Sequence, residues 1–177
     1  ATAFIFGGID FEQQVERILR KAGLTPREDE IKSSARMDSD SPMRAARDAA
    51  LSLAGSSTSI AVFFGPYDRS TIGKHCLQAL QSVLLRNGLS GIPLDVHFDE
   101  GIFPSVSEAN RLQKLFRSLS DVKIYSPNNS RTVLGIQIAD VVAHSFGQIL
   151  KGEIYGESKE IDIGGQNTGY PAGTKAP

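Results

Sequence analysis

The chain has 177 residues, of which 40% are hydrophobic and 22% are charged, and its formal net charge is −1. This balance excludes disorder over the whole length, and any affinity for nucleic acid would have to come from a local basic patch. The single cysteine, Cys76, excludes an internal disulfide and a cysteine-based metal cluster. No apolar run approaches the ~20 residues that a bilayer span needs, and no secretory signal is apparent, so we expect a cytoplasmic protein with no membrane partner.

Hydrophobic periodicity and turn residues predict strands and helices that alternate along the chain. In chain order, the pattern predicts a strand at 2–9, helices at 11–22 and 42–54, a strand at 60–64, a helix at 71–86, a strand at 94–99, a helix at 106–116, a strand at 122–125 and a helix at 132–151. Capping-box patterns begin two of the helices, at Asp10 and at Ser105. Gly23 and Gly88 are predicted helix ends, and Cys76 is predicted to lie on a buried helical face.

This order of elements predicts an α/β fold, namely a single domain with a mixed sheet and flanking helices. The domain is expected to cover residues 1–163. Residues 164–177 form a polar tail rich in glycine and proline, which cannot build a core of its own.

The last predicted helix carries a carboxylate, Asp140, among its apolar positions. At about 100° per residue, Asp140 is expected to project inside the apolar arc of this helix, and Gln137 and His144 flank it on one edge. His144 is a candidate substrate contact. A carboxylate that faces a core is costly unless it is paired or bound to a metal. A buried salt bridge or a hydrogen bond from the helix to a loop would explain Asp140 equally well.

Two further carboxylates come from other elements. Asp99 ends a strand and begins a loop, where catalytic residues commonly gather, although an aspartate before Gly101 also suits a simple turn. Glu30 lies in a polar segment that would otherwise be a solvated loop. Hard divalent cations need carboxylate oxygens that converge from separate elements, and two such ions can assist cleavage of a phosphodiester.

Several short motifs resemble, in order, those of the "domain of unknown function 3800" family. They are residues 30–34 (Glu-Ile-Lys-Ser-Ser), 97–100 (His-Phe-Asp-Glu) and 135–143 (Gly-Ile-Gln-Ile-Ala-Asp-Val-Val-Ala), and residues 4–8 are similar to the family's second strand. The resemblance covers about residues 4–150. The Gly-x-Gln-x-Ala-Asp-x-x-Ala helix is its most specific part.

The resemblance implies a ribonuclease H-like fold and a site for Mg²⁺ or Mn²⁺. Carried over, the candidate metal ligands are Glu30, Asp99 and Asp140, and Lys32 joins them as a catalytic partner of phosphate or carboxylate. Gln137 is implied as a substrate contact or as a support for the ligands. Ser130 is a further candidate substrate contact. The family often has Asp-Ser just before the final helix, whereas Asn129-Ser130 occupies that place here.

The family normally opens with a strand that carries Asp-Glu-Ser-Gly, and this chain shows no such segment before Ala1. The expectation is therefore either a missing N-terminal segment or a non-catalytic member, with self-association through an exposed strand edge beside residues 4–9.

Two hypotheses of function follow. The first is a divalent-metal-dependent nuclease or phosphodiesterase, in the mobile-element or phage-defence context that the resemblance implies. The alternative is a catalytically silent ribonuclease H-like module for binding or assembly. A possible track for nucleic acid is offered by Arg111, Lys114 and Arg117 on one helix and by Arg44 and Arg47 on another, although solvated helix faces explain them as well.

Overall fold

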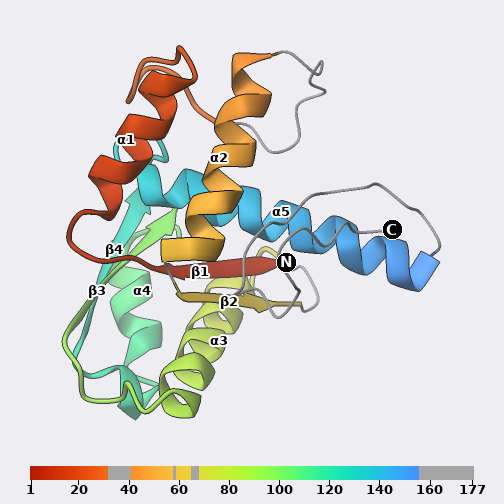
Figure 1. Cartoon of the computed structure of the whole chain (residues 1–177). Helices are drawn as coiled ribbons and strands as arrows, with labels where there is room; N and C mark the ends of the chain where they lie inside the picture. The colour runs from red at the N-terminus through yellow and green to blue at the C-terminus, as the bar shows by residue number, and fades with distance from the viewer. Residues whose placement is uncertain (32–40, 58, 65–67, 156–177) are drawn as a thin grey trace. The chain divides into compact units, whose positions relative to one another are not determined.

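The computed structural model describes residues 1–31, 41–57, 59–64 and 68–155 (Figure 1). Lys32 and the tail at 164–177, both singled out in the sequence, lie outside these residues. The described part of the chain holds five α-helices, one 3-10 helix and four strands, which confirms the predicted α/β class. No helix within it is long and apolar enough to cross a membrane.

The strands are β1 (Thr2–Phe6), β2 (Ser59–Phe63), β3 (Leu94–Asp99) and β4 (Val122–Asn128). The helices are α1 (Phe11–Lys21), α2 (Pro42–Ser57), α3 (Ile72–Arg86), α4 (Val106–Gln113), the 3-10 helix η1 (Arg117–Leu119) and α5 (Leu134–Tyr155). Each α-helix and strand coincides with a predicted element. Boundaries differ by a few residues at most element ends.

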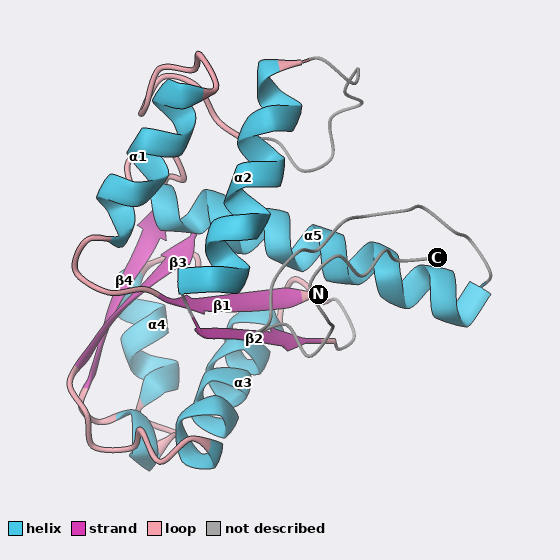
Figure 2. Ribbon diagram, viewed as in Figure 1, coloured by secondary structure: helices cyan, strands magenta, loops and turns pink. Residues whose placement is uncertain are grey.

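The four described strands form two separate two-stranded sheets instead of the one mixed sheet that we expected. β1 pairs with β2 antiparallel, and β3 pairs with β4 parallel (Figure 2). Both orientations of a mixed sheet are therefore present, but in different sheets. The alternation of strands and helices in the sequence showed where strands form, whereas it carried no signal for which strands pair.

The chain divides into two compact units. Among the described residues, unit 1 comprises 1–31, 41–57, 59–64 and 130–155, and unit 2 comprises 68–129. Unit 1 is thus assembled from two stretches that lie far apart in the sequence, while unit 2 is continuous.

In unit 1, α5 packs against β1, and α1 and α2 pack against α5 and against each other (Figure 1). Inward-facing residues of the sheet, such as Ile5 and Val62, meet this helical layer. The buried core of unit 1 is Phe11, Val15, Leu19, Ile31, Ala46, Ala50, Leu51, Ala54, Leu134, Ile138, Val141, Val142 and Ile149.

In unit 2, the helices α3 and α4 pack against each other, and α4 also packs against β4. Phe98 and Phe103 meet edge to face with their ring centroids 5.1 Å apart. The buried apolar residues of unit 2 are Cys76, Leu77, Ala79, Leu80, Val83, Leu84, Phe98, Phe103, Ala109, Leu119, Val122 and Ile124. The predicted burial of Cys76 is confirmed.

The two predicted capping boxes have different outcomes. Ser105 has an extended backbone (φ −162°, ψ 161°), and its hydroxyl oxygen accepts a hydrogen bond from the Glu108 N–H at 3.2 Å. Asp10 precedes α1 with φ −88° and ψ 3°, and its side chain makes no capping hydrogen bond. An N-cap side chain reaches the first turn from an extended backbone, so the backbone angles explain the difference. Gly23 and Gly88, predicted as helix ends, have positive φ values of 80° and 65°.

Candidate functional site

Three of the predicted site residues come together in unit 1 around the buried amide of Gln137. The Oε1 atom of Gln137 accepts a hydrogen bond from the Ile31 N–H at 2.9 Å, and its Nε2 donates to the Ser130 carbonyl at 2.9 Å. The Ser130 hydroxyl donates to Oε1 of Glu30. Gln137 is 1% exposed, so both ends of its amide are satisfied by backbone groups inside the protein. We call Glu30, Ser130 and Gln137 the Gln137 network.

The start of α5, which carries Gln137, is held by a residue that the sequence did not single out. The carboxylate of Glu12 accepts hydrogen bonds from the N–H groups of Leu134 at 3.0 Å and Gly135 at 2.7 Å. A helix N-terminus carries partial positive charge and unpaired N–H groups, so a carboxylate there is stabilising. A Cβ atom at Gly135 would lie 3.3 Å from Glu12 Oε1 and 3.4 Å from the Phe11 ring. The glycine of the family-like motif therefore allows Glu12 to approach closely.

Arg27 makes a third connection, between the loop that follows α1 and the residues just before α5. Its guanidinium donates to the Thr132 carbonyl at 2.9 Å and to a Glu16 carboxylate oxygen at 3.2 Å. Arg27 also has a φ of 71°, in the left-handed region that non-glycine residues seldom adopt. Residues 12–31 are thus hydrogen-bonded at three points, Glu12, Arg27 and Ile31, to residues at or just before the beginning of α5.

Sequence reasoning missed Glu12 and Arg27 because neither pattern is unusual by itself. An acidic residue in the first turn of a helix stabilises its own helix, and an arginine in a polar loop is normally solvated. Their partners lie more than a hundred positions away in the sequence, at Leu134 and Thr132. A local reading of the chain contains no signal for such pairs.

The expected inward orientation of Asp140 is wrong. Asp140 is exposed, and the core face of α5 is formed by other residues. The buried positions on that face are Leu134, Ile138, Val141, Val142, Ser145 and Ile149. At about 100° per residue, this face lies on the side of the helix opposite Asp140. Because α5 is apolar around most of its circumference, the sequence offers two apolar arcs, and the one chosen from the pattern is the less buried.

Asp140 follows Gln137 by one helical turn, and His144 follows Asp140 by another. Gln137 is buried, Asp140 is exposed and His144 is half-buried. These three residues form a polar stripe along α5, with Asp140 about 4.5 Å along the axis from Gln137. Asp140 therefore lies one turn from Gln137 on the same side of α5, and Gln137 is the residue that contacts the segment of Glu30 and Ile31.

Asp99 belongs to unit 2 and ends β3 in a turn. Its Oδ1 accepts a hydrogen bond from the Glu100 N–H at 2.9 Å, and its carbonyl accepts from the Ile102 N–H at 3.4 Å. Gly101 completes the turn with a φ of 88°. The turn-forming role weighed for Asp99 is thus observed. Its side chain is half-buried, and its role as a metal ligand stays a prediction.

Carboxylate oxygens are suitable donors for Mg²⁺ or Mn²⁺, so the chemistry of the three candidate ligands fits a hard cation. Glu30 and Asp99 are half-buried and Asp140 is exposed. In the part of the chain that the structure describes, no group of three or more His, Cys, Asp or Glu side chains lies where it could hold a metal ion.

The basic residues considered as a nucleic-acid track are partly paired with acids. Arg111 donates two hydrogen bonds to the Glu108 carboxylate, at 2.6 and 2.7 Å. This contact lowers the pKa of Glu108 and raises that of Arg111, first through the hydrogen bond and then through charge attraction. On α2, Arg44 lies 3.9 Å from Asp48. These pairings favour the solvated-face interpretation for Arg111 and Arg44.

Comparisons with family models, curated proteins and solved structures give no match for this chain. The resemblance to the "domain of unknown function 3800" family and the ribonuclease H-like assignment therefore stay predictions.

Proposed function

We propose that the chain is a divalent-metal-dependent phosphodiesterase of nuclease type, with a ribonuclease H-like fold. The Gln137 network carries this proposal. It joins residues 30–31 to Ser130 and Gln137 by direct hydrogen bonds, and residues 30–31 and Gln137 lie in two of the segments on which the family resemblance rests. A carboxylate of a polar loop would normally be free in solvent, whereas Glu30 is half-buried and held by Ser130.

Glu30 and Asp140, both in unit 1, are the proposed ligands of Mg²⁺ or Mn²⁺, and Asp99 of unit 2 is a candidate ligand through the family resemblance alone. Mg²⁺ usually keeps several waters and is bound through one or two carboxylates together with phosphate oxygens of the substrate. A site for this ion therefore does not require three protein ligands in one group. When bound, the ion would supply charge stabilisation for the phosphate oxygens that take part in cleavage. Ser130 and Gln137 position Glu30 and its loop.

The test is cleavage of labelled single-stranded and double-stranded oligonucleotides with Mn²⁺ or Mg²⁺. We expect metal-dependent cleavage that Glu30→Gln and Asp140→Asn each abolish. Matched controls are Glu28→Gln, which changes an exposed neighbour in the same loop, and Asp48→Asn, which changes an exposed aspartate on another helix of unit 1. Both controls should retain activity.

A second readout is the melting temperature, because a cation that binds only the folded state raises it. We expect millimolar Mn²⁺ to raise the melting temperature of the wild type and of the two controls, and to have less effect on Asp140→Asn. Absence of both cleavage and a metal-induced shift would refute the proposal.

A catalytically silent binding or assembly module is the second candidate. It is favoured by the lack of a three-residue metal-binding group within the described residues, and by the use of both ends of the Gln137 amide in bonds to the backbone. A folded protein that binds nucleic acid without metal and cleaves no substrate with any divalent ion would support this alternative.

A further inference from the structure

One face of the β3–β4 sheet in unit 2 is exposed and carries two aromatic rings side by side. The parallel register places Asp95 opposite Lys123 and His97 opposite Tyr125. Phe98, Val122 and Ile124 alternate with these residues and are buried in the core. Asp95, His97 and Lys123 are exposed, and Tyr125 is half-buried.

The two rings stack flat against each other. Their centroids are 4.6 Å apart and their planes differ by 6°. This distance is close to the spacing of about 4.7–4.9 Å between neighbouring strands, so the strand pairing itself sets the stack. His97 and Tyr125 lie in strands separated by α4, and the sequence alone did not reveal that their rings meet. We call His97, Tyr125 and Lys123 the β3–β4 platform.

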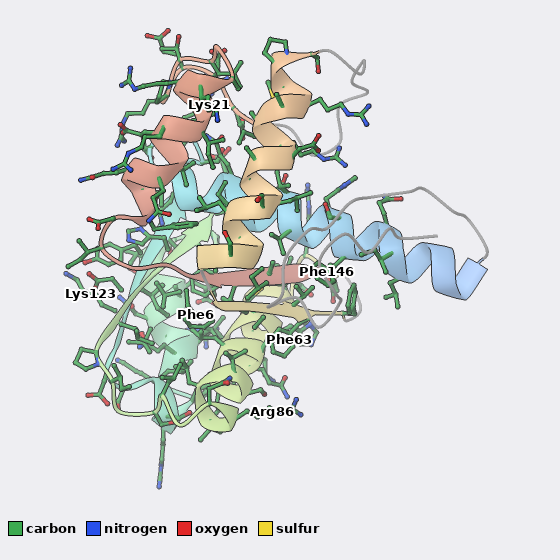
Figure 3. The ribbon with its side chains drawn as sticks, in the orientation of Figure 1. Phe6, Lys21, Phe63, Arg86, Lys123 and Phe146 are labelled. Atoms are coloured by element: carbon green, nitrogen blue, oxygen red, sulfur yellow. The ribbon has the colours of Figure 1, made fainter. Side chains whose placement is uncertain are left out.

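Lys123 adds a cation to the platform. Its Nζ atom lies 4.9 Å from the centroid of the Tyr125 ring, and Figure 3 shows the side chain projecting outward from β4. The interaction with Tyr125 raises the pKa of Lys123, first through a hydrogen bond and then through charge attraction. Asp95 lies opposite Lys123 and offsets part of this charge.

We propose that the β3–β4 platform binds an unpaired base of single-stranded nucleic acid, which stacks on the exposed ring of His97 while Lys123 contacts a backbone phosphate. This inference rests on the proposed nuclease function and names its substrate class. A flat aromatic surface favours a flat partner, and every base offers a π-face for stacking on aromatic side chains. Bases inside a duplex have both faces covered by their neighbours, so an unpaired base is the one that fits.

The platform lies next to one of the candidate metal ligands. His97 and Asp99 are alternate residues of β3, so they are about 6.6 Å apart along the strand, and a bulge falls between them. A base stacked on His97 brings the adjoining backbone towards the carboxyl end of β3, where Asp99 lies. The same strand would thus hold the base and present an acidic group to its phosphodiester.

The experiment measures fluorescence anisotropy of a labelled oligothymidine of about 12 nucleotides, long enough for such a surface, against a duplex of equal length. The full chain is titrated in EDTA, so that binding is separated from cleavage. We expect the single strand to bind more tightly than the duplex, and His97→Ala to weaken its binding about 5- to 150-fold, the range for loss of one stacked base.

The matched control is His75→Ala, which removes an exposed histidine from α3 of the same unit and should leave binding unchanged. Tyr125→Phe keeps the ring, so its affinity for the single strand should be within a few-fold of that of the wild type. Tyr125→Leu should bind the single strand as weakly as His97→Ala does. Lys123→Gln should reduce the salt dependence by about one phosphate contact. Because His97 is exposed, His97→Ala is expected to fold even if Tyr125→Leu does not.

The proposal is overturned if no single-strand binding occurs, if the duplex binds equally well, or if His97→Ala binds like the wild type. These outcomes are distinct from failure of the nuclease function. Binding that depends on His97 without any metal-dependent cleavage would refute the nuclease and retain the platform. Metal-dependent cleavage together with binding that does not depend on His97 would refute the platform and retain the nuclease function.

Discussion

Replacing Gln137 by leucine should destabilise unit 1 well beyond what an exposed glutamine-to-leucine change does. Leucine has a similar volume and helix propensity, so the cavity and propensity costs are small. The Ile31 N–H, beside a side chain that is 1% exposed, would lose its acceptor, and a buried donor left unpaired costs about 1–3 kcal/mol. The Ser130 carbonyl would also lose a donor, at about 0.5–1.5 kcal/mol. We expect a total loss of about 2–4 kcal/mol.

Urea unfolding followed by far-UV circular dichroism measures this loss in a chain that has no tryptophan. Hydrogen exchange at the Ile31 amide, followed by NMR, tests the bond itself, since exchange should accelerate in Gln137→Leu. The matched control is Gln13→Leu, at an exposed position of α1 in the same unit. It should change stability by no more than about 0.5 kcal/mol. An equally small loss for Gln137→Leu, or an Ile31 amide that stays protected, would refute the reasoning.

Glu12→Ala should lower the unfolding free energy by about 1–2 kcal/mol, because the N-terminus of α5 loses its capping carboxylate; thermal unfolding measures this. Gly73→Ala should cost about 1–3 kcal/mol through overpacking, because its Cβ would lie 2.5 Å from the buried Phe103 ring and 3.0 Å from a backbone oxygen. Arg111→Ala should return the pKa of Glu108 towards its ordinary value, as followed by NMR titration. The lowered pKa means that the stabilising contribution of the pair is present above the ordinary glutamate pKa and is lost as the pH falls through the lowered value.

The first two of these variants each have a control in the chain. Glu28→Ala removes an exposed glutamate and should leave the melting temperature unchanged. Gly8→Ala adds a Cβ that would meet nothing within 4 Å, so it should be neutral where Gly73→Ala is costly. Equal effects within either pair would contradict the contacts described above. A Glu108 pKa that does not respond to Arg111→Ala would show that the ion pair does not form in solution.

Local features of the fold were predictable because they depend on nearby residues. The pattern of apolar positions located every described α-helix and strand, and the glycines at 23 and 88 marked helix ends through their positive φ values. The cap at Ser105 was also readable from the sequence. The sequence did not reveal that the Asp10 side chain makes no capping hydrogen bond, because the residue type alone does not determine the backbone angles on which such a bond depends.

Features that join distant segments were harder to predict. The predicted inward orientation of Asp140 was wrong because α5 is apolar on nearly all sides. Tertiary packing decides which apolar arc is buried. Glu12 and Arg27 were missed because their partners lie on another part of the chain. By contrast, Glu30, Ser130 and Gln137 were all named as candidates, and Ser130 contacts both of the others.

The discontinuity of unit 1 has a consequence for synthesis on the ribosome. Ile31 and Gln137 are 106 positions apart, and at about 5–20 residues per second the partner of Ile31 is made roughly 5–20 s later. Unit 2 is continuous, so it can finish folding within that interval. Until α5 emerges, Phe11, Val15 and Leu19 lack part of the surface that buries them, because α1 packs against α5 as well as against α2. The first half of unit 1 is therefore the part of the nascent chain most in need of a chaperone.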